Sequence, residues 1–429
     1  GAAIQRLHDA LGYETVGINH IGDWGSQFGK LVAAVDRWGD TVDMEGDPIP
    51  SLLALYVRYH QEEADDPELV QAARDAFKEL ESGREGPVRK IWRHLTELSL
   101  VEFDKIYSRL HVTFDEVRGE SFYEPYLDQT VERVVAAGIT EESEGALVVR
   151  LDEFGDLPPC LLRKTDGTTL YTTRDLAAAF HRWDLYAFER CLYVVGADQR
   201  LHFRQLKHVL ERMGLDWESR MQHVDFGMLR LPEGKMSTRA GRVVFLEDVL
   251  DQAVEAVATV MRTKNPDLEC LEEVAEQVGV GAVVFNDLKR ERVRDVEFVW
   301  EEILSFEGDT GPYVQYTHAR LASILRKAEA AGEGGAEPDW DGLADAGVVL
   351  GRVGRFPAVI VNAALHAEPS EIAGYLLGLC RELNSWIAAQ RVLGQEPGLT
   401  AARLAFVDAC KIVLAKGLHL LGVSAPEEM

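Results

Sequence analysis

The feature that most constrains the fold is a strand signal that leads through a polar loop into an amphipathic helix. Residues 190–214 read RCLYVVGADQRLHFRQLKHVLERMG, an apolar run followed by a Gly/Asp/Gln loop and then a helical period. Residues 1–34 show a similar rhythm of helix, strand, loop and helix. Ligands of open parallel sheets bind at the carboxyl ends of the strands. The loop with Gly196, Asp198 and Gln199 is therefore a candidate ligand site, although it lacks a phosphate-loop fingerprint.

The rest of the chain alternates between helical and strand-bearing stretches. Residues 52–110 are helical by period with a break at ESGREGP, which predicts a helical insertion. Strand signals return at ALVVRLDEFG and at CLLRKTDGTTLYTT, where Asp166-Gly167 predicts a hairpin turn. A last pair of strands is predicted at HVDFGMLRL and RVVFLEDVL, on either side of PEGKMSTRAG.

Beyond about residue 263 the chain is helical by period. Its last helix is predicted to begin at an N-cap Thr400 and to end at Gly422 and Pro426. The pattern as a whole predicts an α/β domain with a parallel sheet and a helical insertion, followed by an all-α region.

Composition indicates a globular protein of a reducing compartment. The chain has 46% hydrophobic and 27% charged residues in 429 positions, and no apolar run approaches the roughly 20 residues of a membrane span. The five cysteines include no CxxC pair, so we expect no disulfides, no metal site and a cytoplasmic location. A net charge of −27 argues against generic nucleic-acid binding but leaves room for a local basic strip.

Two motifs carry candidate chemistry, each beside a simpler structural interpretation. Lys235–Arg239, KMSTR, lies in a Gly-rich loop whose lysine, hydroxyls and arginine suit a polyphosphate. Its alternative is a solvated hairpin tip. In LYTTRDLAAAF, Thr172 or Thr173 is a predicted helix cap, and Asp175 either pairs with a cationic substrate or stabilises the helix dipole.

Two further segments carry polar or aromatic residues whose role the local pattern does not decide. Glu120, in RGESFYEP, is a lone acid and is expected to be solvated. The segment SFEGDTGPYVQYTHARLASILRK interleaves aromatics with bases, which suits stacking on unpaired RNA bases. Its alternative is an amphipathic helix with a half-buried aromatic face.

In this combination and order, the motifs resemble class I arginyl-tRNA synthetases over nearly the whole chain. The resemblance rests on these stretches: NHIGDWGSQFG, GESFYEP, LYTTRDLAA, YVVGADQRLHF, GKMSTRAG, GAVVFNDLKRERVRDVEF, LSFEGDTGPYVQYTHAR and LGVSAPEEM. GDWGSQFG and GDTGPYVQYTHAR resemble the arginine enzyme specifically.

The resemblance implies a domain order and roles for particular residues. It implies a Rossmann-type catalytic domain at 1–45 and 116–262, a helical insertion at 46–115, a connector at 263–312 and an all-helical anticodon-binding domain at 313–429. Arginine would be held by Tyr171, Asp175, Gln199 and Glu120. ATP would lie at Gly196, Asp198, His202, Gly227, Met228 and Lys235. The phosphates would be stabilised by the catalytic loop Lys235, Met236, Ser237, Thr238 and Arg239. tRNA would contact Tyr313, Tyr316, His318 and Arg320.

The implied activity is ATP-dependent ligation of L-arginine to tRNA(Arg), with Mg²⁺ accompanying ATP, by a monomeric enzyme without a membrane partner. The family usually needs bound tRNA before it activates arginine, so we expect the same here. Two alternatives remain: a non-catalytic tRNA-binding or partner-binding protein derived from the enzyme, and another class I adenylate-forming enzyme. The second does not account for the arginine-specific stretches.

The sequence departs from the family pattern at two places. Thr238 stands where class I loops often have a second lysine. The His-Ile-Gly-His-type signature, which in the family precedes a segment like GAAIQRLHDALGYE, is absent, as are the first strand and an N-terminal domain. We therefore expect this chain to be the later four-fifths of such an enzyme.

Overall fold

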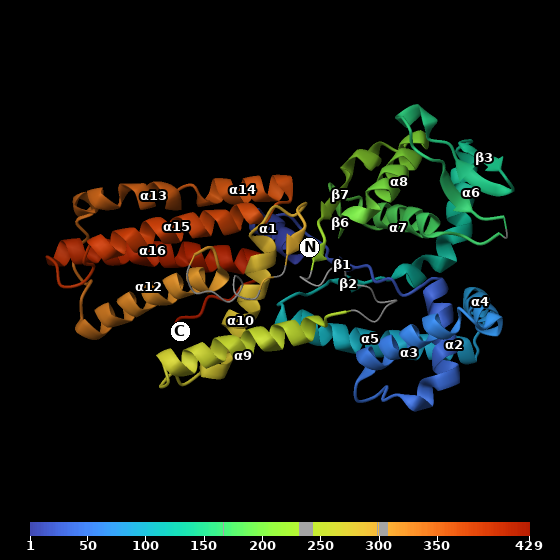
Figure 1. Cartoon of the computed structure of the whole chain (residues 1–429). Coiled ribbons are helices and arrows are strands. Elements are labelled where there is room, and N and C mark those ends of the chain that lie inside the picture. The colour runs from blue at the N-terminus through green and yellow to red at the C-terminus, as the bar shows by residue number, and fades with distance from the viewer. Residues whose placement is uncertain (166, 231–242, 298, 300–307) are drawn as a thin grey trace.

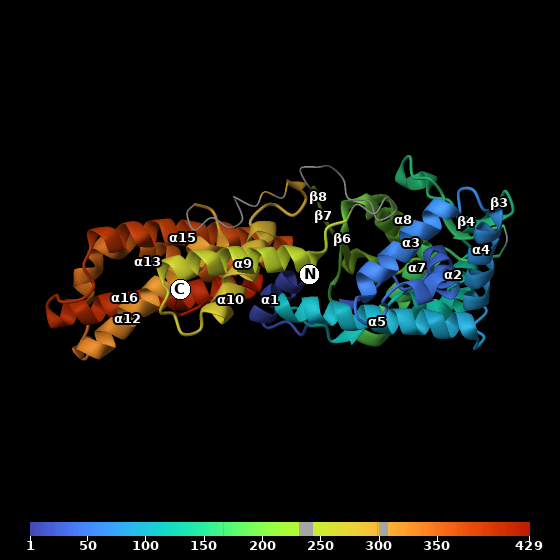
Figure 2. The ribbon, with the colours of Figure 1, turned by 60° about the horizontal axis from the view of Figure 1, so that its bottom comes forward.

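The computed structural model describes residues 1–165, 167–230, 243–297, 299 and 308–429. Figures 1 and 2 show a long molecule with a helical bundle at one end and an α/β part at the other. The N-terminal helix α1 (Ala2–Ala10) lies where the two parts meet.

Short parallel strand pairs form the centre of the α/β part. β1 (Ile18–Asn19) pairs with β2 (Glu116–Val117), and β6 (Cys191–Gly196) pairs with β7 (Met221–Phe226) over six residues. β8 (Leu229–Arg230) pairs in parallel with β9 (Val296–Glu297). Parallel strands need crossover connections, and the chain supplies them with helices and with the whole insertion between β1 and β2.

A second group of elements packs beside β6 and β7. It comprises η2 (Glu120–Tyr126), α6 (Leu127–Ala136), the antiparallel strands β3 (Thr140–Ser143), β4 (Ala146–Val149) and β5 (Cys160–Arg163), α7 (Tyr171–Tyr186), η4 (Ala197–Gln199) and α8 (Arg200–Arg212). Its core includes Leu162, Leu176 and Leu206, all fully buried. This packing fixes the start of α7 against β5, because Thr173 Oγ1 donates to Leu162 O at 2.6 Å.

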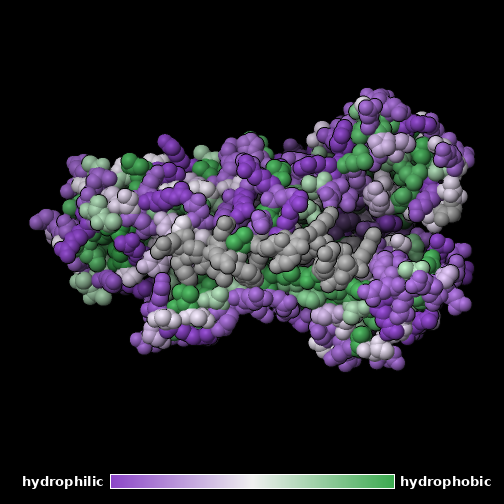
Figure 3. Space-filling view, in the orientation of Figure 1, coloured by the Kyte–Doolittle hydropathy of each residue, from purple (hydrophilic) through white to green (hydrophobic). Residues whose placement is uncertain are grey.

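The insertion and the helix before it form a compact helical lobe. The lobe comprises α2 (Ser26–Trp38), which precedes the insertion, and α3 (Pro48–Glu62), α4 (Pro67–Glu81) and α5 (Pro87–Arg109) within it. Asp66 caps α4 by accepting from Glu68 N, and Pro67 occupies the first turn, where its missing N–H leaves no bond unmade. In Figure 3 the surface is hollowed between this lobe and the one that holds α7 and α8.

The far end is all helical. α9 (Leu246–Lys264) and α10 (Leu271–Leu288) pack together, and the bundle follows with α12 (Gly311–Ala331), η7 (Trp340–Ala346), α13 (Gly347–Val353), α14 (Phe356–His366), α15 (Ser370–Ala389) and α16 (Pro397–Leu421). Thr310 caps α12 by accepting from Tyr313 N. The bundle core is continuous from α12 through α16.

The expected fold class is confirmed, but three local predictions are wrong. The strand predicted at 242–250 does not form over its described residues, because residues 243–245 are irregular and α9 begins at Leu246. Thr400 is not the cap of α16, which begins three residues earlier at Pro397. Neither threonine caps α7, because its N-cap is Leu170 without a side-chain bond. Gly422 does end α16, with the left-handed φ of 81° that favours glycine.

All five cysteines are free. One stretch of the described residues, Trp340–His366, is long and apolar enough by composition to cross a membrane. A single stretch of this kind is weak evidence for a membrane span. In the structure it is divided between η7, α13 and α14.

Candidate active site

Asp175 is the centre of a polar cluster between three segments of the α/β part. It lies in the second turn of α7, and its side chain is 18% exposed. Its Oδ2 lies 2.6 Å from His202 Nε2 on α8, and its Oδ1 lies 3.7 Å from His20 Nε2, just after β1. A carboxylate held from two sides by imidazoles has a fixed orientation, so it can present a defined edge to a ligand.

His20 is held from its other side. Its Nδ1 lies 3.1 Å from Arg118 O and 3.2 Å from Arg182 Nη2. Burial, followed by the positive charge of Arg182, lowers the pKa of His20. This favours the neutral form of the ring, which orients Asp175 without cancelling its charge.

Glu120 provides a second carboxylate close to Asp175. Its Oε2 accepts from Arg174 Nε at 2.8 Å, and its backbone N donates to Ile21 O at 3.0 Å. Burial raises the pKa of Glu120, Arg174 opposes the rise, and the nearby carboxylates of Asp175 and Asp23 add to it. Glu120 is thus not the solvated acid that its sequence context predicts.

Asp23 belongs to the same acidic region but is already fully engaged. It is buried, and it accepts from the backbone N of Ser121 at 2.9 Å and from the Ser121 hydroxyl. A side chain at Gly119 would collide with its carboxylate. Asp23 therefore ties the loop after β1 to η2, while Asp175 and Glu120 remain for a ligand.

Three further residues predicted for the two small substrates lie on or next to the helices that carry Asp175 and His202. Tyr171 is half exposed, and its ring meets that of His202 edge-on at 4.8 Å. Asp198 and Gln199 are exposed in η4, at the carboxyl end of β6. Asp198 and Gln199 thus lie in the kind of loop that binds ligands in parallel sheets, the loop after the carboxyl end of a strand.

The prediction that His202 contacts ATP does not fit its place in the structure. His202 is 5% exposed, and its Nε2 is bonded to Asp175. A buried imidazole in that position orients the carboxylate and leaves little of its surface for a nucleotide.

Gly227 and Met228 are the two residues between β7 and β8, and we call their backbone the edge beyond β7. Gly227 N donates to Arg292 O at 2.7 Å, and Met228 N donates to Asp295 Oδ1 at 2.8 Å. A side chain at Gly227 would collide with Arg294 O. The edge is therefore fixed by the segment before β9. The predicted catalytic loop, Lys235, Met236, Ser237, Thr238 and Arg239, lies outside the described residues.

Of the residues predicted to contact tRNA, Tyr316 is the most open, with 52% of its surface exposed on α12. Asn384 Nδ2 lies 3.3 Å from the Tyr313 hydroxyl, and Arg320 Nη1 donates to Asn384 Oδ1 at 3.1 Å. His318 is 1% exposed, and its Nδ1 lies 2.9 Å from Pro426 O. It is an interior residue of the bundle, so we leave it out of the contacts with tRNA.

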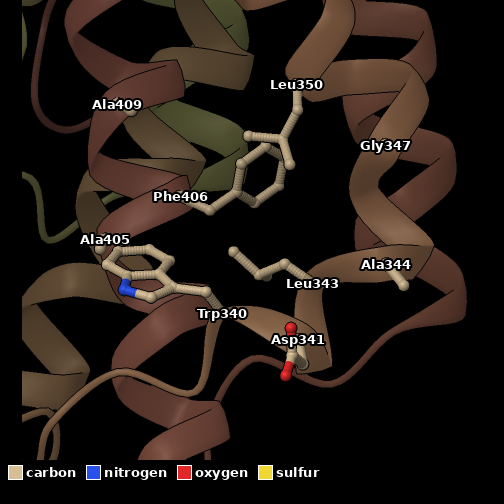
Figure 4. Close-up of a pocket in the computed structure, with 9 residues that line it drawn as sticks. All are labelled: Trp340, Asp341, Leu343, Ala344, Gly347, Leu350, Ala405, Phe406 and Ala409. Carbon is tan, nitrogen blue, oxygen red and sulfur yellow. The ribbon is translucent and has the colours of Figure 1, made fainter.

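A hollow of about 570 Å³ lies elsewhere, in the helical bundle. Figure 4 shows Trp340, Leu343, Leu350 and Phe406 around it, with Asp341 at its edge. Its apolar lining lacks the paired charges of the cluster around Asp175, so the geometry favours the latter as the site of a charged ligand.

Comparison with protein families decides the identity. A profile described as "tRNA synthetases class I (R), catalytic domain" matches residues 1–300, and one described as "DALR anticodon binding domain" matches residues 314–429. The chain belongs to the arginyl-tRNA synthetases.

Individual synthetases agree with this assignment. The arginine–tRNA ligase of Clostridioides difficile is 44% identical over all of this chain and 75% of its own length. That of an Exiguobacterium species is 47% identical over all of this chain and 76% of its own. The Thermus thermophilus arginyl-tRNA synthetase structure is 27% identical, with a TM-score of 0.84 over all of this chain and 78% of its own.

The residues of this candidate site that were not predicted as functional include His20, Arg174 and Arg182. His20 stands in NHIGDWG, and Arg174 directly precedes Asp175, so both lie within motifs that the sequence singles out. Their partners are far away in the chain, however. Arg182 and His20 are 162 positions apart, and Arg174 and Glu120 are 54 apart.

Proposed function

We propose that this chain activates L-arginine with ATP and transfers the arginyl group to tRNA(Arg), as an arginine–tRNA ligase. The observation that carries the proposal is the pair of carboxylates, Asp175 and Glu120, each fixed by a cationic or aromatic-ring neighbour. A guanidinium presents its donors in a planar fork that suits carboxylates at fixed positions.

The arginine side chain would donate to Asp175 and Glu120, with the ring of Tyr171 as a wall of the pocket. Gln199 would bond the amino-acid end of the substrate. His20 and His202 would hold Asp175 in place, and Arg174 would hold Glu120. A substrate cation would also offset the burial and the nearby carboxylates, which raise the pKa of Glu120.

ATP would lie along the carboxyl ends of the strands. Gly196 and Asp198 would approach its ribose, while Gly227 and Met228 would border adenine. The family resemblance supports Lys235 and its neighbours through Arg239 as the group that neutralises the phosphates. Mg²⁺ would arrive with the phosphates of ATP.

The chemistry requires positioning more than proton transfer. The carboxylate oxygen of arginine attacks the α-phosphorus of ATP, the bond to the bridging oxygen breaks, and pyrophosphate departs with that electron pair. The terminal adenosine hydroxyl of tRNA then attacks the arginyl carbonyl, and AMP leaves. In the first step the protein orients two anions and stabilises the charge that accumulates on pyrophosphate.

The partner domains follow from the same proposal. We retain the catalytic domain at 1–45 and 116–262, the insertion at 46–115, the connector at 263–312 and the anticodon-binding domain at 313–429. Tyr313, Tyr316 and Arg320 remain as proposed contacts with tRNA. We also retain a monomer in the cytoplasm. No observation favours a non-catalytic protein over the ligase.

The test is arginine-dependent exchange of pyrophosphate into ATP, measured with tRNA on the protein as its own cells make it. Citrulline is the most informative substrate analogue because it keeps the shape of arginine without its charge. We expect exchange with arginine and at least about 100-fold less with citrulline, which lacks the charge, or with lysine, which lacks the planar fork. A site built to hydrogen-bond a particular group rejects analogues without that group. Equal exchange with citrulline would contradict the paired-carboxylate pocket. Exchange that proceeds equally well without tRNA would contradict the expected tRNA requirement.

A further inference from the structure

Arg292 lies where the helical bundle meets the strand that ends at Gly227, and its backbone is bonded on both sides. Its C=O accepts from Gly227 N at 2.7 Å. Its N–H faces the Glu368 carboxylate, with oxygens at 3.3 and 3.4 Å. Glu368 belongs to the turn between α14 and α15, so one residue, Arg292, connects this turn of the bundle to the backbone of Gly227, directly after β7.

The side chain of Arg292 makes the same connection a second time. Its Nη1 donates to Asp225 Oδ1 at 2.9 Å, and its Nε lies 3.9 Å from Glu368 Oε2. All three side chains are largely buried, with exposures of 22% for Arg292 and 17% for each acid. Although burial opposes it, hydrogen bonds from Arg200 and Arg292 hold the pKa of Asp225 below its usual range.

The surroundings make this connection stiff. Ser370 Oγ donates to Glu368 Oε1 at 2.9 Å, which fixes the carboxylate from the bundle side. Ile4 of α1, Val224 of β7 and Ala367 form one buried apolar cluster next to it. A packed interface with charged bonds at its edge resists small shifts, so displacing Glu368 displaces Arg292 with it.

The segment after Arg292 supports the rest of the edge. Asp295 accepts from Met228 N, and Val296 N donates to Met228 O at 2.9 Å. β8 and β9 then pair in parallel. The backbone of residues 227–230 thus rests on residues 292–297, and Glu368 anchors the start of that support.

We propose that Arg292 is a positioning residue, which transmits the position of Glu368 on the helical bundle to the Gly227–Met228 backbone and thereby sets the affinity for ATP. The inference rests on the proposed function, because that proposal places adenine at Gly227 and Met228. It assigns no contact with substrate to Arg292 itself.

Equilibrium binding of ATP and of arginine, measured by calorimetry on the full-length protein, tests the proposal without requiring turnover. Glu368→Gln keeps the size of the side chain and removes its charge, while Arg292→Met removes the guanidinium. We expect each variant to weaken ATP binding by about 3–10-fold, the effect of one disturbed hydrogen bond, and to leave arginine binding within about twofold. Arg292→Lys, which keeps the charge but not the fork, should fall between wild type and Arg292→Met.

Glu371→Gln is the matched control. Glu371 lies one turn further along, in the first turn of α15, and it contacts Asn362 and His366 rather than Arg292. It should bind ATP as the wild type does. The double variant Arg292→Met/Glu368→Gln should bind ATP no less tightly than the single variant with the lower ATP affinity, because both substitutions act through one connection.

The outcomes separate the two proposals. Unchanged ATP binding in both single variants would overturn the positioning role. Equal losses of ATP and arginine binding, together with a lower unfolding temperature, would also overturn it, because that pattern is general loosening of the fold. A wild-type protein without arginine-dependent exchange would overturn the proposed function instead, and Arg292 would still be judged by ATP binding.

Discussion

At the scale of single residues, the orientation of Asp175 matters as much as its charge. The imidazoles of His202 and His20 contact its two oxygens, so the carboxylate has little freedom to turn. A ligand cation then meets a preorganised partner and loses little affinity to ordering it. Arg174 has the same effect on Glu120.

Asp175→Asn should lower kcat/KM for arginine at least about 30-fold, because loss of one partner of a buried charged hydrogen bond costs about 2–5 kcal/mol. Affinity for tRNA should stay within twofold of the wild type. Steady-state charging and a tRNA titration measure the two quantities. Asp184→Asn is the control on the same helix, since Asp184 is exposed and pairs loosely with Arg133 at 3.6 Å. Near-normal charging by Asp175→Asn would remove Asp175 from the arginine pocket.

Glu124 offers a residue-scale test of pH dependence. Burial raises the pKa of Glu124 from 4.5 to about 7, with Arg89 opposing the rise. The folded protein therefore binds this proton more tightly than the unfolded chain, so stability falls as pH rises from about 4.5 to 7. The penalty is absent below pH 4.5 and complete above pH 7.

Glu124→Gln should thus unfold at the same urea concentration as the wild type near pH 4.5 and at a higher one at pH 8. After allowance for partial exposure, the gain at pH 8 should be about 1 kcal/mol. Glu132→Gln, at an exposed position of α6, should show no such pH-dependent gain. A gain that is the same at both pH values would show that charge burial is not its cause.

At the scale of elements, the sequence predicted what local patterns determine. The β6–η4–α8 unit follows from one apolar run, a Gly-containing loop and a helical period. The start of α9 was missed because Val243, Val244 and Phe245 look like a strand by composition, although the helical period from Leu246 decides the structure. Thr400 is a good cap by type, but Pro397 offers an earlier first turn and the helix begins there.

In the site, too, local sequence patterns predicted some residues, and contacts between distant residues determined the others. Asp175 stood out because an acid follows a strand signal at the start of a helix. The roles of His20 and Arg182 depend on a contact between residues far apart in the chain. The burial of His318 likewise depends on Pro426, which reaches it from the end of the chain. Such long-range pairings leave no local periodicity, so a single sequence does not reveal them.

The face of α12 yields an element-scale prediction. Tyr316 points to solvent, whereas Val314 and His318 on the same helix are buried. Tyr316→Ala should weaken tRNA binding by about 1–3 kcal/mol, the value of one aromatic stacking contact with a base. Tyr316→Phe is the matched control, because it keeps the ring and should bind within twofold of the wild type. Equal binding by Tyr316→Ala, measured by fluorescence anisotropy at fixed salt, would return Tyr316 to an ordinary surface role.

At the scale of the whole molecule, α1 joins the two ends. It packs against α14 and α16 of the bundle, and its Ile4 reaches the strand β7 through the cluster with Val224 and Ala367. The α/β part and the bundle are therefore joined by a buried apolar contact as well as by the bonds of Arg292. The stability of the whole molecule should depend on this contact.

Ile4→Ala should lower the free energy of unfolding by about 2–4 kcal/mol, because truncation leaves a cavity between elements that cannot collapse onto it. Ile4 is 5% exposed, whereas Ile412 on α16 is 58% exposed, so Ile412→Ala is a control with the same change of side chain. It should alter the free energy by no more than about 0.5 kcal/mol. Urea unfolding followed by circular dichroism gives both values. If Ile4→Ala matched Ile412→Ala, the cluster would contribute nothing to joining the two parts. If Ile4→Ala instead split one transition into two, the junction would be what makes the catalytic part and the bundle unfold together.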